Sequence, residues 1–182
     1  NATADQMMTS AKALAERIPA DATVMIFFAG VGANIDGKDF LAGVDCELST
    51  DTSKMVAKAE IYRLFMSKGA RVFAFFEANR PIVAGRYFGM EVPLVGSIAQ
   101  VQATMPGDVV YGISRTGKTI GVFTEAMTGV ISDLRSSTIP ILEFGWQVFY
   151  RIRRGDTGRS GGGSRQTPTL PVLTNMASDA KF

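Results

Sequence analysis

Two runs of apolar residues set the strongest constraint on how this chain folds. Residues 22–30 read ATVMIFFAG and residues 70–78 read ARVFAFFEA, and both are rich in valine, isoleucine or phenylalanine. A half-exposed strand alternates apolar and polar residues, whereas a strand buried on both faces is apolar throughout. The two runs therefore predict strands in the interior of a mainly parallel sheet that helices cover on both faces.

Segments with helical periodicity alternate with these strands. We expect helices over residues 3–18, 53–69, 124–135 and 143–154, and a third buried strand over residues 108–114. This alternation is typical of an α/β sandwich, in which functional loops lie at the carboxyl ends of the strands. Candidate functional residues are therefore expected just after each apolar run.

The composition limits the chemistry more than it limits the fold. The chain has 182 residues, a net charge of +2 and no histidine. Its size predicts a single domain over residues 1–182, and the small net charge gives no reason to expect a nucleic-acid partner. Without imidazole, histidine-based triads and the usual zinc sites cannot form, and we expect no metal or other cofactor. Cys46, the one cysteine, is interpreted as a small packing residue.

Two further features concern organisation. Residues 155–165, GDTGRSGGGSR, predict a flexible loop rich in glycine and arginine. No apolar run reaches the roughly 18 residues that span a bilayer, so no membrane span is expected. The compartment stays open, and a processed N-terminus is one possibility because residue 1 is asparagine.

One motif suggests nucleotide binding. A phosphate-binding loop pattern is matched by Gly112, four intervening residues, Gly117, Lys118 and Thr119. An apolar run precedes this pattern, and a segment with helical periodicity follows it. A working loop of this kind also needs a later strand that ends in an acid for magnesium, and the candidate TIPILEFG is interrupted by Pro140. We interpret the match as coincidence and keep a nucleotide-binding enzyme that uses residues 112–119 as the alternative.

The amino-acid sequence around the predicted strands resembles that of a known family. Residues 27–49 (FFAGVGANIDGKDFLAGVDCELS), 69–81 (GARVFAFFEANRP) and 121–131 (GVFTEAMTGVI) are similar, in this order, to motifs of the caspase-like cysteine peptidases, in particular bacterial and metacaspase-type members. The resemblance implies a three-layer α/β/α sandwich with a mainly parallel sheet. It covers nearly the whole chain but omits the family's first strand, first helix and second strand.

The resemblance also implies that the active site has been lost. The family's catalytic histidine falls on Val31 and its nucleophilic cysteine on Asn79, while Glu77 replaces the acid that precedes the cysteine. Such peptidases attack with a thiolate generated beside an imidazole, and valine and asparagine supply neither group. We interpret the chain as a pseudopeptidase without catalytic residues, serving as a structural or protein-binding subunit. A fragment of a cysteine endopeptidase with a non-standard site is a further alternative.

The remnant of the substrate cleft is a second candidate site. According to the resemblance, Asn34, Asp36, Glu77, Arg80 and Ser114 surround this cleft and could hold a peptide without cutting it. The interpretation that we favour is structural. In it, Asp36 and the following glycine form a turn, and Glu77 pairs with Arg80 or with a backbone donor.

The order of the elements predicts a partner. The chain begins on a helix, whereas folds of this kind normally begin on a strand, so the strand over residues 22–30 is expected to have an unpaired edge. We expect an upstream strand, from the same precursor or from another chain of a homo- or hetero-oligomer, to pair with that edge.

Overall fold

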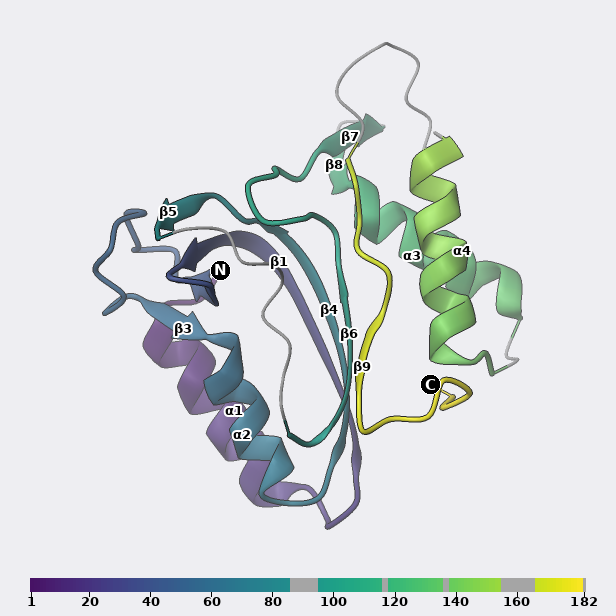
Figure 1. The fold of residues 1–182 in the computed structure, drawn as a ribbon, viewed down its shortest axis with the longest axis horizontal. Coiled ribbons are helices and arrows are strands. Elements are labelled where there is room, and N and C mark those ends of the chain that lie inside the picture. The colour runs from purple at the N-terminus through teal and green to yellow at the C-terminus, as the bar shows by residue number, and fades with distance from the viewer. Residues whose placement is uncertain (86–94, 116–117, 136–137, 155–165, 182) are drawn as a thin grey trace.

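The computed structural model describes residues 1–85, 95–115, 118–135, 138–154 and 166–181, which form an α/β sandwich (Figure 1). A central sheet lies between one layer of helices, α1 and α2, and another, α3 and α4. The helices are α1 (Ala4–Arg17), α2 (Lys58–Met66), α3 (Val122–Leu134) and α4 (Ile141–Arg154). The strands are β1 (Thr23–Ile35), β2 (Lys38–Ala42), β3 (Met55–Ala57), β4 (Arg71–Asn79), β5 (Ile82–Ala84), β6 (Ser97–Gln102), β7 (Gly112–Arg115), β8 (Lys118–Gly121) and β9 (Val172–Thr174).

The strands of the central sheet follow the order β3-β2-β1-β4-β6-β9, and β5 pairs with the end of β1. The pairs β1–β4 and β4–β6 are parallel, whereas β1–β2, β2–β3 and β6–β9 are antiparallel. A parallel centre with helices on both faces confirms the α/β class that the apolar runs predict.

Strand β4 separates two hydrophobic cores. Phe73 and Phe75 are fully buried against α3 and α4, while Val72 and Phe76 face α1 and α2. Successive side chains of a strand point to opposite faces of the sheet. A strand that supports both cores must therefore be apolar along its central part, as residues 72–76 are.

Local signals set the ends of two elements. Thr3 and Gln6 form a capping box at the start of α1, satisfying backbone donors of its first turn. Asp36 and Gly37 have φ values of 49° and 79°. These left-handed conformations suit the two-residue turn of a β-hairpin, and the two residues join β1 to β2 as the sequence predicts.

Several predicted boundaries are wrong. β1 continues to Ile35 because residues 32–35 pair with β2, so the loop expected after residue 30 does not form. The helix expected from residue 53 begins at Lys58, because residues 55–57 form β3. Residues 108–114 do not form a strand of the central sheet: β7 pairs with β8 in a separate two-stranded sheet.

The third parallel strand is β6, which the hydrophobic pattern does not reveal. Its sequence, SIAQVQ, contains Gln100 and Gln102, yet both side chains are buried. Gln100 accepts a hydrogen bond from the Tyr62 hydroxyl at 2.7 Å, and Gln102 accepts one from the Lys58 ammonium group at 2.6 Å. Because these partners come from α2, far away in sequence, a search for continuous apolar runs misses the strand.

Candidate functional site

The two positions that correspond to the peptidase dyad lie side by side. Val31 of β1 and Asn79 of β4 are partners in the parallel register that runs from Thr23 to Val31. Val31 is 41% exposed, and the Asn79 side-chain oxygen accepts a 2.7 Å hydrogen bond from the backbone N–H of Val110. The hydrocarbon side chain of Val31 can move no proton, and the amide of Asn79 helps to hold the segment around Val110 in place.

Glu77 is occupied by the start of helix α3. Its carboxylate accepts hydrogen bonds from the backbone N–H groups of Phe123 (2.9 Å) and Thr124 (3.3 Å), and from the Thr124 hydroxyl. The N-cap residue of α3, Gly121, has no side chain that could make these bonds. Glu77 therefore acts as the cap of α3 supplied by β4, since a carboxylate also suits the positive end of the helix dipole.

Gly121 makes this arrangement possible. A Cβ atom built on Gly121 would lie 2.1 Å from the carboxylate atoms of Glu77, far inside van der Waals contact. Of the two partners expected for Glu77, the structure therefore shows the backbone donor and not Arg80.

Arg80 belongs to a buried ionic cluster on the other face of the sheet. Its guanidinium group contacts Asp39 at 2.6 and 3.3 Å and donates to the backbone carbonyl of Thr104 at 3.0 Å. The ammonium group of Lys58 lies 3.2 Å from Asp39 and 4.2 Å from the centre of the Phe76 ring. Side-chain exposure is 3% or less for Asp39, Lys58 and Arg80.

The electrostatics of the cluster favour an ionised Asp39. Burial raises the pKa of Asp39, but the charges of Lys58 and Arg80 and the hydrogen bonds from Arg80 and Asn34 outweigh it, leaving the pKa below its ordinary value. Asp39 and Lys58 were not among the sequence candidates. The available signal was that Asp39 lies just after the Asp36–Gly37 turn and directly before the apolar residues Phe40 and Leu41.

The other cleft candidates do not gather in one place. Asn34 is buried and donates to Asp39 at 3.0 Å, whereas Asp36 is exposed in the hairpin turn. The backbone of Ser114 pairs with Thr119 in the β7–β8 hairpin, and its side chain lies outside the described part of the structure. The described side chains thus separate into a helix cap, an ionic cluster and a turn.

The phosphate-loop alternative lacks its structural context. Gly112 pairs with Gly121, and Thr119 with Ser114, so the motif forms an antiparallel hairpin rather than a loop between a strand and a helix. In a phosphate-binding loop the backbone N–H groups surround the phosphates, whereas residues 112–115 of this motif pair with residues 118–121 in an antiparallel ladder. Gly117 and the side chain of Lys118 lie outside the described part. The described pairing therefore differs from the strand–loop–helix context that the nucleotide-binding alternative requires.

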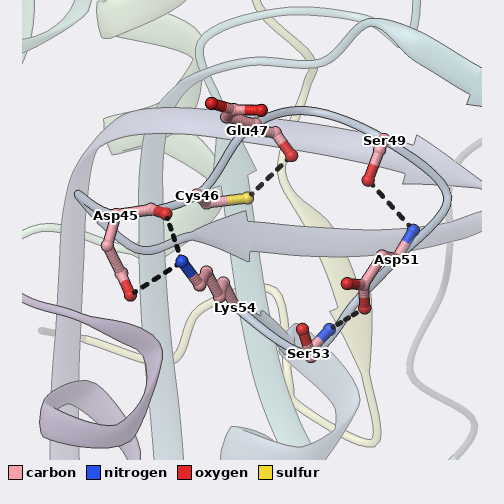
Figure 2. Close-up of a pocket in the computed structure, with 7 residues that line it drawn as sticks. All are labelled: Asp45, Cys46, Glu47, Ser49, Asp51, Ser53 and Lys54. Carbon is pink, nitrogen blue, oxygen red and sulfur yellow. Dashed lines mark hydrogen bonds and ion pairs between the residues drawn. The ribbon is translucent and has the colours of Figure 1, made fainter.

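A shallow pocket beside Cys46 is the remaining place with reactive side chains. Figure 2 shows that Lys54 points toward Asp45, while the Cys46 thiol donates to the backbone carbonyl of Glu47 at 3.4 Å. Burial raises the pKa of the Cys46 thiol, and the negative charge of Asp45 raises it further. The thiol therefore stays protonated near neutral pH, which makes it a poor nucleophile.

The described parts of the chain contain neither a cluster of metal ligands nor a helix suited to a bilayer. These residues include no group of three or more Cys, Asp or Glu side chains placed to hold a metal ion. Within the same residues, no helix has both the length and the apolar character needed to cross a bilayer.

Comparison with known proteins shows the fold. No family model matches the sequence, and no curated protein sequence matches it. Among solved structures, protein GSU0716 from Geobacter sulfurreducens superposes with a TM-score of 0.61 and 15% identity, over 94% of this chain and 73% of that chain. The chain of pro-sf-caspase-1 superposes with a TM-score of 0.60 and 15% identity, over 94% of this chain and 70% of that one.

These superpositions place the chain in a structural class. It has an α/β fold similar to that of a caspase, with a mainly parallel central sheet flanked by helices. At 15% identity the likeness concerns the fold alone.

Proposed function

We propose that the chain is a catalytically inactive caspase-like domain that serves as a structural or protein-binding subunit. The observation that carries this proposal is the pairing of Val31 with Asn79 on adjacent strands, at the positions where the resembling peptidases have histidine and cysteine. A cysteine peptidase needs a thiolate beside a base, and neither residue type supplies one.

The roles of the neighbouring residues support the proposal. Glu77 caps α3, Arg80 is bound to Asp39, and Asn79 bonds to the backbone of Val110. These three polar side chains thus stabilise the scaffold, which is what a domain with a structural or binding role requires.

The first strand supplies a surface for a partner. Among the described residues, Thr23–Val31 pair with β4 on one side only, whereas the end of β1 also pairs with β2 and β5. Met25, Phe27 and Val31 share one face of β1 and are 51%, 43% and 41% exposed. We infer that an extended strand, from an upstream segment of the same precursor or from another chain, adds to this edge.

The loss of catalysis is tested by rebuilding the dyad. In a Cys46→Ser background the introduced thiol is the only one, so its pKa can be measured from the pH dependence of alkylation by iodoacetamide. With Asn79→Cys alone, we expect a pKa near the free value of about 8.5. Adding Val31→His should lower it by about one unit or more, because the imidazolium ion stabilises an adjacent thiolate.

The parent chain provides the matched measurement. It should cleave none of a set of fluorogenic peptides with arginine, lysine or aspartate at the scissile position. Cleavage by the parent that Asn79→Ala abolishes would instead establish a peptidase with a non-standard site. Equal thiol pKa values with and without Val31→His would show that the two positions do not form a dyad.

A further inference from the structure

Helix α4 carries exposed aromatic side chains on its outer face. Its inner face, including Phe144, Val148 and Ile152, is buried in the core with α3. Its outer face carries Trp146 and Tyr150, which are 37% and 51% exposed. A surface helix usually has polar residues on the side away from the core, so large aromatic side chains there call for an explanation.

The aromatic residues of this face contact one another. The rings of Trp146 and Tyr150 are stacked with centroids 5.4 Å apart, and the edge of Phe149 packs against both. The guanidinium group of Arg154 lies over the Tyr150 ring at 5.9 Å. Tryptophan, tyrosine and arginine in such groups are the residue types that contribute most binding energy at protein interfaces.

The charges on this outer face have opposite signs at its two ends. Glu143 and the nearby Asp179 line a hollow at the start of α4 together with Trp146. Arg153 and Arg154 lie in the last turn, and within the described residues neither forms an ion pair with a carboxylate. The face thus runs from acidic, through aromatic, to basic.

This pattern is symmetric about the middle of the helix. Residues in an α-helix follow one another at about 100°. Trp146 and Tyr150 are two residues before and after Val148, and Glu143 and Arg153 are five residues before and after it. At this angular step all four lie on the side of the helix opposite the buried Val148. If a second α4 packs antiparallel about a two-fold axis at this level, each Glu143 faces an Arg153 and each Trp146 meets a Tyr150.

We propose that α4 is a self-association surface, and that its occupant is a second copy of this chain packed antiparallel through the Trp146–Tyr150 face. Self-complementarity is what an isologous two-fold interface requires. A uniformly negative nucleic acid would place phosphates against Glu143 and Asp179, whereas a second copy matches both ends. The interface is independent of the inactive site and of the β1 edge, so it goes beyond the proposed function.

A charge swap tests the interface. Sedimentation velocity of the parent chain should show a reversible monomer–dimer equilibrium, with a dissociation constant on the order of micromolar because one helix pair forms a small interface. Glu143→Arg and Arg153→Glu should each weaken the dimer by about tenfold or more, since each places like charges opposite one another. The double variant, which restores opposite charges, should return the affinity to within about threefold of the parent.

A matched swap on another helix controls for net charge. Glu16 and Arg17 are exposed in the last turn of α1, on the other side of the sheet. Glu16→Arg/Arg17→Glu should leave the dimer unchanged, and circular dichroism should show every variant folded.

The single tryptophan reports on the contact directly. Trp146 is the only tryptophan in the chain, so its emission should shift to shorter wavelength as the concentration rises through the dissociation constant. Monomers up to about 1 mM, where association provides only about 4 kcal/mol, would overturn the proposal. So would a dimer that the two single swaps leave intact, or a double swap that fails to restore it.

Discussion

Asp39 supplies the negative charge that offsets the two buried cations, Lys58 and Arg80. Replacement by asparagine would leave Lys58 and Arg80 buried, with side-chain exposures of 3% and 2%, without that counter-charge. We expect Asp39→Asn to lower the free energy of unfolding by about 3–5 kcal/mol, as measured by urea denaturation. Lys58→Met should cost clearly less, because the Asp39–Arg80 pair survives. Equal losses in the two variants would contradict this account of the cluster.

The same aspartate makes stability depend on pH. Its folded-state pKa lies below the ordinary value, so the unfolded chain binds the proton more readily. The stabilisation is therefore fully present above the unfolded pKa of about 3.9 and is lost as the pH falls through the folded pKa. Unfolding free energies measured from pH 7 down to pH 3 should fall more steeply below about pH 4 for the parent than for Asp39→Asn. Parallel curves for the two proteins would exclude this linkage.

The start of helix α3 depends on a side chain from another element. Glu77→Ala leaves the N–H groups of Phe123 and Thr124 without their acceptor. We expect a loss of about 1–2 kcal/mol, the usual cost of removing a helix cap, and a partial recovery with Glu77→Gln. Thermal melts followed by circular dichroism provide the comparison. An unchanged melting temperature in Glu77→Ala would mean that the cap is replaceable.

The edge of β1 should make the isolated chain prone to aggregate. An exposed strand edge with large apolar side chains is a template for pairing with other chains, and a lysine on the edge opposes it. Phe27→Lys should therefore slow aggregation on mild heating, as followed by light scattering. Ile131→Lys on α3, where isoleucine is 44% exposed against 43% for Phe27, is the matched control. Similar slowing in both variants would point to general charge rather than to the edge.

The two cores share β4 and β6, so the whole described chain should unfold as one unit. Trp146 reports on the α4 layer, and a fluorophore attached to the single cysteine, Cys46, reports on the region after β2. In one cooperative transition, both probes should have the same denaturation midpoint. Separate midpoints would show that the layers are distinct units, against the single-domain expectation.

Residues 155–165, expected to be a flexible loop, lie outside the described part.

The sequence by itself determined the α/β class, two of the parallel strands and the Asp36–Gly37 turn. These features follow from local patterns: β1 and β4 are largely apolar runs, and the turn needs left-handed backbone. β4 is buried on both faces, as such a run predicts, whereas β1 leaves Met25 and Phe27 exposed on one face, so the prediction of burial on both faces is wrong for β1. That both strands end at one edge of the sheet follows from a parallel arrangement, whereas the register that pairs Val31 with Asn79 is seen only in the structure.

Only the tertiary structure decided the remaining features, because their partners are distant in the chain. Gln102 of β6 is tolerated inside the sheet because Lys58 reaches it across 44 residues, and Glu77 caps a helix that begins 45 residues later. The residues that match a phosphate-binding loop lie in a hairpin, because β7 pairs with β8. No motif in the sequence specifies this pairing. The hydrophobic pattern of a segment predicts which of its residues are buried. Which distant side chain pairs with a buried polar group is determined only when the layers pack.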